Sequence, residues 1–192
     1  MSMAARHIPL IAPDEYLDQE ARSETKHMYY AGAVTAMAGG SLIHAILAGN
    51  LLGLLYAGLR GRGCQVVGSD LLFRTGSGAM FTYPDVTVIC GSAETVPGRK
   101  HVLTNPLFVA EVLSPSTEAI DRGAKSSEYR ATRSLRQYAL ISQDQPWVQI
   151  HTRDEAGSWQ VSEVSGLDGV CAFTGIDCAV PMAALYEGVL EE

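Results

Sequence analysis

An acidic residue inside an apolar strand constrains the fold of this 192-residue chain more than any other feature. The run from Pro106 to Leu113 is apolar except for Glu111. Such runs are typical of strands that are buried on both faces of a sheet. A carboxylate in that setting is costly unless a cation, a proton or a hydrogen-bond donor compensates it. Asp85 repeats the pattern, because it opens an apolar run that ends at Cys90.

If the strands of Asp85 and Glu111 are neighbours, the two acids can converge at one edge of the sheet. Two carboxylates a few ångströms apart repel each other unless a cation or a proton lies between them. Hard oxygen ligands of this kind select Mg²⁺ or Mn²⁺, with a backbone carbonyl and waters completing the coordination. One hypothesis is therefore a divalent-cation site. In the alternative, Asp85 is only a turn acid after Pro84 and Glu111 belongs to an ion pair in the core.

The composition sets broad limits. The length predicts a single domain over residues 1–192 that buries about 70% of its unfolded surface. A hydrophobic fraction of 47% and a charged fraction of 18% exclude wholesale disorder, and a net charge of −7 argues against a general nucleic-acid coat protein. No signal-peptide pattern occurs in Met1–Arg6, so a cytoplasmic protein with reduced thiols is expected. The cysteines lack the spacing of a zinc site: Cys64, Cys90, Cys171 and Cys178.

The segment from Ala31 to Leu59 contains no charged residue and is long enough to span a bilayer. Several glycines, His44 and Asn50 interrupt it, so we expect a soluble protein and no membrane span. The pattern predicts a strand over Gly32–Met37, a Gly-Gly turn, and a helix from Leu42 to about Leu59 with Ser41 as its N-cap. A helix that is apolar on most sides is either central to the fold or half of a dimer interface.

The remaining periodicity predicts an α/β sandwich with a mixed sheet. We expect helices from Pro13 to about Ala21 and from Arg122, capped by Asp121, to about Thr132. A polar loop is expected over Gly91–Asn105, and a closing segment over Ile176–Leu185. Besides the Asp85 and Glu111 strands, the expected strands are Lys26–Tyr30, Gln65–Arg74, Arg136–Ser142, Trp147–Arg153 and Trp159–Val164.

The predicted helix that follows the Glu111 strand carries further candidates. Lys125 and Tyr129 are four residues apart and therefore project from one helix face. A lysine ammonium beside a metal can orient a water molecule and neutralise charge that develops on a phosphoryl group. Basic residues cluster here, and a solvated helix face is the alternative reading: Arg122, Lys125, Arg130, Arg133 and Arg136.

Several short motifs together resemble the Uma-type family of restriction endonucleases, from about Pro13 to Tyr186. They are Glu24-x-Lys26-His27, Met37-Ala38-Gly39-Gly40-Ser41-x-x-His44, Gly68-Ser69-Asp70, Tyr83-Pro84-Asp85-Val86, Glu111-Val112-Leu113-Ser114-Pro115-Ser116-Thr117-Glu118, Asp121-Arg122-Gly123-x-Lys125, Tyr129-Arg130 and Ser134-Leu135. The resemblance implies the PD-(D/E)XK nuclease fold, a restriction-endonuclease-like core over residues 13–186. Its central mixed sheet is flanked by helices, and extra strands lie at both ends.

The resemblance also implies roles for particular residues. Asp85 and Glu111 would bind Mg²⁺ or Mn²⁺ together with the Val112 carbonyl, and Lys125 would complete the catalytic set. The superfamily pattern has a lysine where this chain has Leu113, and its role passes to Lys125. Accessory roles fall to Glu24, His44, Asp70, Asp121 and Tyr129, and phosphate contacts to Arg122, Arg130 and Arg133.

Two of the accessory candidates have an ordinary alternative. Asp70 could simply bond backbone amides at the end of a strand, and His44 could be a hydrogen-bonded core histidine. The resemblance implies that most members of the family carry Glu where this chain has Met28 and an acid where it has Ala31, and Glu24 is the only nearby replacement.

The leading hypothesis from the sequence is a Mg²⁺-dependent endonuclease acting on DNA, with a homodimer as the favoured assembly. Cleavage of RNA or of a small phosphodiester would use the same residues. The hypothesis from a different class is a catalytically weakened, dimeric interaction or DNA-binding module on a nuclease scaffold, which the acidic balance and the residues Met28 and Ala31 support. Serine-hydrolase, phosphate-loop and dinucleotide-binding signatures do not occur in the sequence.

Overall fold

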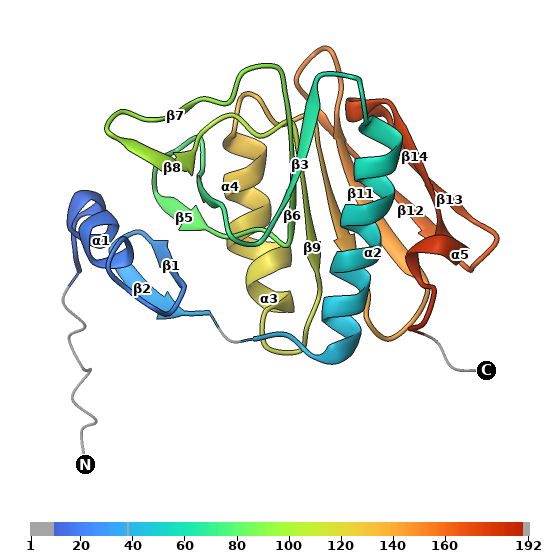
Figure 1. Cartoon of the computed structure of the whole chain (residues 1–192), viewed down its shortest axis with the longest axis horizontal. Helices are drawn as coiled ribbons and strands as arrows, with labels where there is room; N and C mark the ends of the chain where they lie inside the picture. Colours follow the sequence, from blue (N-terminus) through green and yellow to red (C-terminus); the bar gives the residue numbers. More distant parts are fainter. Residues whose placement is uncertain (1–9, 38, 190–192) are drawn as a thin grey trace.

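A six-stranded mixed sheet forms the centre of the protein (Figure 1), whose computed structural model describes residues 10–37 and 39–189. In spatial order its strands are β12 (Trp159–Ser165), β11 (Trp147–Arg153), β10 (Gln137–Ile141), β9 (Phe108–Val112), β6 (Val86–Cys90) and β3 (Cys64–Gly68). Strands β9 and β10 are parallel, and the other neighbouring pairs are antiparallel. The structure thus confirms the expected mixed sheet.

The innermost strands are buried on both faces. All five residues of β9 are buried, and so are all five residues of β10. Alternate residues of β9 belong to two different apolar clusters, with Phe108 and Ala110 on one side and Val109 on the other. This explains why the Glu111 strand reads as a nearly continuous apolar run.

Helix α2 (Leu42–Leu59) covers one face of this sheet. Ser41 is its N-cap, as expected, because its hydroxyl accepts a hydrogen bond of 3.1 Å from the His44 amide. Four leucines spaced by four residues form the buried stripe: Leu47, Leu51, Leu55 and Leu59. By length and composition α2 is the one described helix that could cross a membrane, and in this structure its leucine stripe packs on the sheet.

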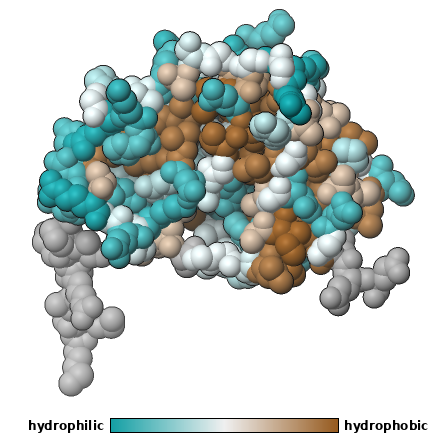
Figure 2. Space-filling model, viewed as in Figure 1, coloured by the Kyte–Doolittle hydropathy of each residue, from teal (hydrophilic) through white to brown (hydrophobic). Residues whose placement is uncertain are grey.

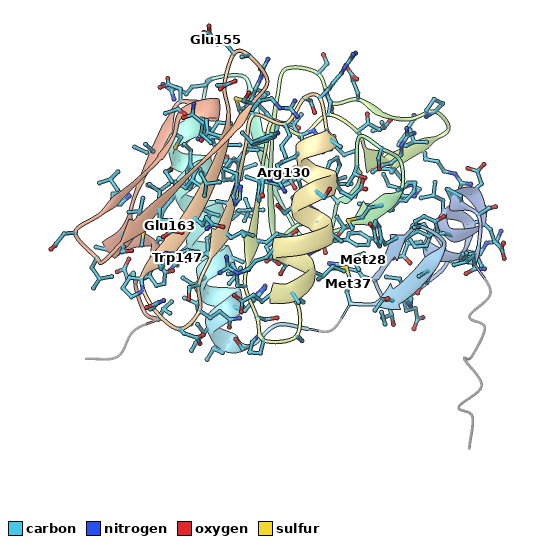
Figure 3. All side chains as sticks on the ribbon, turned by 180° about the vertical axis from the view of Figure 1, so that it is seen from behind. Met28, Met37, Arg130, Trp147, Glu155 and Glu163 are labelled. Atoms are coloured by element: carbon cyan, nitrogen blue, oxygen red, sulfur yellow. A yellow bond between two sulfur atoms is a disulfide. The ribbon has the colours of Figure 1, made fainter. Side chains whose placement is uncertain are left out.

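A helical segment of three parts covers the opposite face of the sheet (Figures 1 and 3). Its parts are α3 (Glu118–Ile120), a π-helical turn η1 (Asp121–Lys125) and α4 (Ser126–Ala131). The predicted helix from Arg122 to Thr132 therefore begins four residues earlier than expected. Asp121 is wrong as an N-cap, because it lies inside the helical segment with a buried side chain.

A second sheet lies beside the first and carries the N-terminal part of the chain. Its strands, in spatial order, are β2 (Ala33–Ala36), β1 (His27–Tyr30), β5 (Met80–Thr82), β4 (Leu72–Arg74), β8 (Arg99–Leu103) and β7 (Thr95–Val96). Helix α1 (Pro13–Glu20) packs on it through the aromatic cluster of Tyr16, Tyr29 and Phe81. The predicted first helix and first hairpin are confirmed.

The chain closes with a short hairpin that packs on the α2 side of the central sheet. Strands β13 (Val170–Phe173) and β14 (Cys178–Pro181) are joined by the 3-10 turn η2 (Thr174–Ile176), and α5 (Met182–Leu185) follows. Asn50 of α2 donates hydrogen bonds to the carbonyls of Leu185 (3.0 Å) and Glu187 (2.9 Å). This amide fixes the segment from Leu185 to Glu187 against the helix.

Two sequence expectations are wrong in detail, whereas the predicted Asp85 strand is confirmed as β6, which begins directly after Asp85. The predicted strand Gln65–Arg74 is two strands in different sheets, because the chain turns at Ser69 and Asp70. The predicted loop Gly91–Asn105 contains the antiparallel strands β7 and β8. The segment Met1–Arg6 and residue Ala38 lie outside the described residues.

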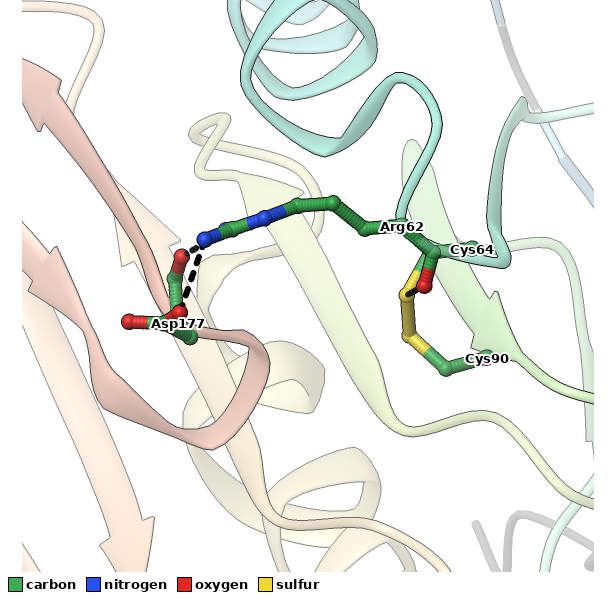
Figure 4. The surroundings of a disulfide bond; sticks show 4 residues. All are labelled: Arg62, Cys64, Cys90 and Asp177. Atoms are coloured by element: carbon green, nitrogen blue, oxygen red, sulfur yellow. Dashed lines mark hydrogen bonds and ion pairs between the residues drawn. A yellow bond between two sulfur atoms is a disulfide. The ribbon is translucent and has the colours of Figure 1, made fainter.

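Two of the cysteines are paired, contrary to the expectation of reduced thiols. Cys64 of β3 and Cys90 of β6 face each other in the antiparallel register, with their Cα atoms 4.0 Å apart, and form a disulfide (Figure 4). Nearby, Arg62 forms an ion pair of 2.8 Å with the Asp177 carboxylate. Cys171 and Cys178 carry free thiols.

Candidate active site

The sheet brings the two predicted acids together. Asp85 directly precedes β6, which pairs with β9 so that Val86 lies opposite Ala110. One carboxylate oxygen of Asp85, Oδ2, accepts a hydrogen bond of 2.8 Å from the backbone amide of Val112, the residue next to Glu111. The Asp85 carboxylate is thereby held beside Glu111, as the hypothesis of adjacent strands requires.

Polar side chains from the helical segment cover Glu111. Lys125 places its ammonium 3.1 Å from Oε1 of Glu111 and 2.8 Å from Oδ1 of Asp121. Tyr129 donates a hydrogen bond to the same Oε1. The four side chains form a buried network, with Glu111, Asp121 and Lys125 each less than 5% exposed.

The π-helical turn explains how Lys125 reaches this position. A π turn holds one more residue than an α turn and is often found at functional sites. Asp121 and Lys125 are both buried at the two ends of η1, whereas Arg122 and Gly123 between them are exposed. The turn therefore presents both ionic side chains to Glu111. Lys125 and Tyr129 project from one helix face, as expected, and both donate hydrogen bonds to Glu111.

Burial controls the ionisation of this network. It is the largest cause that raises the pKa of Glu111 from 4.5 to about 8, against the opposing field of Lys125. Burial alone would lower the pKa of Lys125, but the fields of Glu111 and Asp121 outweigh it and hold that pKa above 10.5. Burial also raises the pKa of Tyr129. Lys125 therefore stays a charged donor, and Glu111 favours its ionised form only when further positive charge is near.

His44 approaches Asp85 from the first turn of α2. Its Nε2 lies 3.2 Å from Oδ2 of Asp85, and this hydrogen bond is the main cause that raises the pKa of His44 above 6.5. Gly40 makes the position of the ring possible, because a Cβ at Gly40 would lie 2.7 Å from ring atoms of His44. The structure thus joins His44 to the predicted site through Asp85.

These groups share one cavity of about 850 Å³, lined by the central sheet, by α2 and by segments that flank the strands of the second sheet. Asp85, Glu111, Val112, Lys125 and His44 all line it. Its α2 wall is made of small or apolar residues such as Ala45 and Gly49. On the face of the molecule drawn in Figure 2, apolar residues gather in the middle and polar residues surround them.

The donor set fits a hard divalent cation that is held partly by water. The hydrogen bonds to Asp85 end on Oδ2 and those to Glu111 end on Oε1, which leaves Oδ1 and Oε2 as candidate ligands. Val112, the predicted carbonyl ligand, lines the same cavity. Within residues 10–37 and 39–189, no group of three His, Cys, Asp or Glu side chains could hold a metal by itself. A cation here would depend on these two acids, a carbonyl and waters.

The other predicted residues lie at differing distances from the cavity. Glu24 is exposed and lines it, whereas Asp70 does not line it and pairs with Lys26 at 2.6 Å. Arg122 lies in a neighbouring groove. Arg130 and Arg133 are exposed outside the cavity, near the end of α4 (Figure 3 labels Arg130).

Sequence reasoning missed three polar residues of this region. Lys26 lines the cavity, donates to the Ser69 carbonyl at 2.9 Å, and lies 5.5 Å from the ring centre of Tyr83. Its place in the motif Glu24-x-Lys26-His27 was the available signal. Gln143 lines the cavity and accepts a hydrogen bond of 2.5 Å from Ser41, across 102 residues of sequence. No local pattern could have revealed that contact.

The third residue, Glu20, is a buried acid. It does not supply the free carboxylate that is missing at Met28 and Ala31. Its Oε1 accepts hydrogen bonds from the His27 amide (2.8 Å) and the Tyr83 hydroxyl (2.9 Å), and its Oε2 lies 2.9 Å from Nδ1 of His27. Both oxygens are therefore engaged, and Oε1 holds Tyr83, a residue of the cavity wall.

The fold is that of a restriction-endonuclease-like nuclease. The crystal structure of a putative nuclease of family DUF820 from Anabaena variabilis matches with a TM-score of 0.75 and 15% identity, covering 94% of this chain and 99% of that one. The Uma2 family model, described as a putative restriction endonuclease, matches residues 13–179, so the chain belongs to the Uma2 family.

Curated relatives of similar length occur in Synechocystis. The uncharacterised protein slr1290 is 33% identical over 183 residues, which cover 94% of each chain. The uncharacterised protein sll1609 is 28% identical over 165 residues, which cover 86% of this chain and 93% of that one.

Proposed function

We propose that this protein is a divalent-metal-dependent endonuclease that hydrolyses phosphodiester bonds in DNA. The observation that carries the proposal is the convergence of Asp85, Glu111 and Lys125 at the wall of one cavity, on a nuclease fold. Asp85, Glu111 and the Val112 carbonyl would hold Mg²⁺ or Mn²⁺. The bound ion would supply Lewis-acid polarisation of the scissile phosphate and of a water molecule.

The protein's own groups prepare this chemistry. Lys125 stays protonated, so it acts as a donor that orients the attacking water and offsets charge on the phosphoryl group. Asp121 and Tyr129 hold the Lys125–Glu111 pair in place. His44 and the Val112 amide fix the orientation of the Asp85 carboxylate. Arg130 and Arg133 are proposed to contact flanking phosphates, whereas the predicted phosphate contact of Arg122 is not retained, because Arg122 is already paired with Glu118.

The test is cleavage of a plasmid and of a short labelled duplex with Mg²⁺, Mn²⁺ or EDTA. Asp85→Asn should abolish metal-dependent cleavage, while Asp70→Asn, a matched acid outside the cavity, should retain it. An RNA strand and a small phosphodiester tested in parallel define the substrate class. Undiminished cleavage by Asp85→Asn would contradict the assignment.

A second candidate, a non-catalytic DNA-binding module, is favoured by one observation. Lys125 is paired with both Glu111 and Asp121, so the buried ion network is complete in the protein alone. Calorimetric titration with Mn²⁺ separates the two functions. The endonuclease should show saturable binding that is lost in Asp85→Asn, and the module should show none.

A further inference from the structure

A second groove continues from the candidate active site. It has a volume of about 490 Å³ and shares Ser114, Pro115 and Gln143 with the cavity. These residues follow β9 and β10, so the groove lies past the strand end that carries Glu111. A polymer whose scissile phosphate reached Asp85 and Glu111 could therefore place a neighbouring unit in this groove.

An indole and a guanidinium form one wall of the groove. The guanidinium carbon of Arg122 lies 5.1 Å from the ring centre of Trp147, which is half-buried on β11. The indole N–H donates a hydrogen bond of 3.2 Å to Glu163 on β12, as the neighbouring positions of the two residues in Figure 3 allow. The ring plane is thus fixed before any ligand arrives, which reduces the entropy lost on binding.

The charges in the groove suit a nucleobase better than a phosphate. Arg122 is already paired with Glu118 at 2.7 Å, and Asp144 supplies a second carboxylate to the lining. One guanidinium beside two carboxylates does not attract a phosphate. Planar cationic and aromatic groups stack well on bases, and carboxylates accept hydrogen bonds from their amino groups.

We propose that this groove is a nucleobase subsite, in which a base next to the scissile phosphate stacks against Trp147 beside Arg122. The inference rests on the proposed function for the identity of its ligand. Base stacking of this kind requires an unpaired base, so the subsite favours single-stranded or locally opened DNA.

Tryptophan fluorescence tests the subsite without cleavage. The chain has only two tryptophans, so Trp147 and Trp159 can be separated. In EDTA, a dodecamer of deoxyadenosine should quench the wild type and Trp159→Phe, but not Trp147→Phe. Trp147→Ala should bind a labelled dodecamer about tenfold more weakly, as expected for the loss of one base–aromatic stack. Circular dichroism verifies that each variant is folded.

An abasic strand of the same length provides the matched ligand. Equal quenching of Trp147 by the abasic strand would overturn the inference, because it would identify a phosphate contact. Unchanged affinity in a folded Trp147→Ala variant would also overturn it. The proposed function has its own test: it fails if the wild type with Mn²⁺ leaves DNA intact. Base-dependent quenching of Trp147 would still support the subsite in that case.

Discussion

The buried carboxyl of Glu111 gives a pH dependence whose sign and size follow from the structure. Its pKa is about 8 in the folded protein against an ordinary 4.5, so the folded state binds this proton more tightly. The contribution of Glu111 to stability is therefore fully present below pH 4.5 and is lost as the pH rises towards 8. At about 1.4 kcal/mol for each pH unit, the loss at pH 7 amounts to roughly 3 kcal/mol.

The assay compares the free energy of unfolding of the wild type with that of Glu111→Gln in metal-free buffer from about pH 4 to 8. Glutamine keeps the size of the side chain and carries no titrating group, so the difference between the two curves isolates Glu111. The wild type should lose stability relative to the variant as pH rises. Lys125 does not titrate in this interval, because its pKa lies above 10.5. A difference that stays flat across this range would refute the reasoning.

Other changes have equally definite outcomes. Cys64→Ser removes the disulfide to Cys90, which links two residues 26 positions apart in the sequence. The free energy of unfolding, measured by urea titration, should fall by about 3 kcal/mol. An unchanged midpoint would contradict this. Tyr129→Phe removes a hydrogen bond to Glu111 and should raise the pKa of Glu111 above about 8, measured by the same pH series. The pKa of His151 is lowered to about 4, chiefly by burial, so NMR should show a ring that stays neutral at pH 6 and stability that falls as pH drops from 6.5 through 4.

Much of the fold and the position of the two acids could be predicted from local patterns. Asp85 and Glu111 stand out because acids rarely interrupt apolar strands, and adjacent strands bring them together. The helix α2 follows from its N-cap at Ser41 and its uncharged length. Each of these features depends on residues that are close together in the sequence, so it can be predicted from a single sequence.

Long-range register could not be predicted in the same way. The pairing of Cys64 with Cys90 appears only when β3 is aligned against β6. The alternation from Gln65 to Arg74 continues through the turn at Ser69 and Asp70, so it hides the change of sheet. Strand β8 contains Arg99 and Lys100, whose charges suggested a loop, because the first three residues of this strand are not buried.

The π turn at Asp121–Lys125 brings the ammonium of Lys125 to Glu111, although this lysine lies on the helical segment that follows the Glu111 strand and not on the strand itself. An α-helix rotates by about 100° for each residue, so one residue more or less in a turn re-aims all the side chains that follow. Removing one residue from this π-helical turn would direct the ammonium of Lys125 away from Glu111. In this chain the geometry of the helical segment, rather than the number of residues between Glu111 and Lys125, decides whether the two side chains meet.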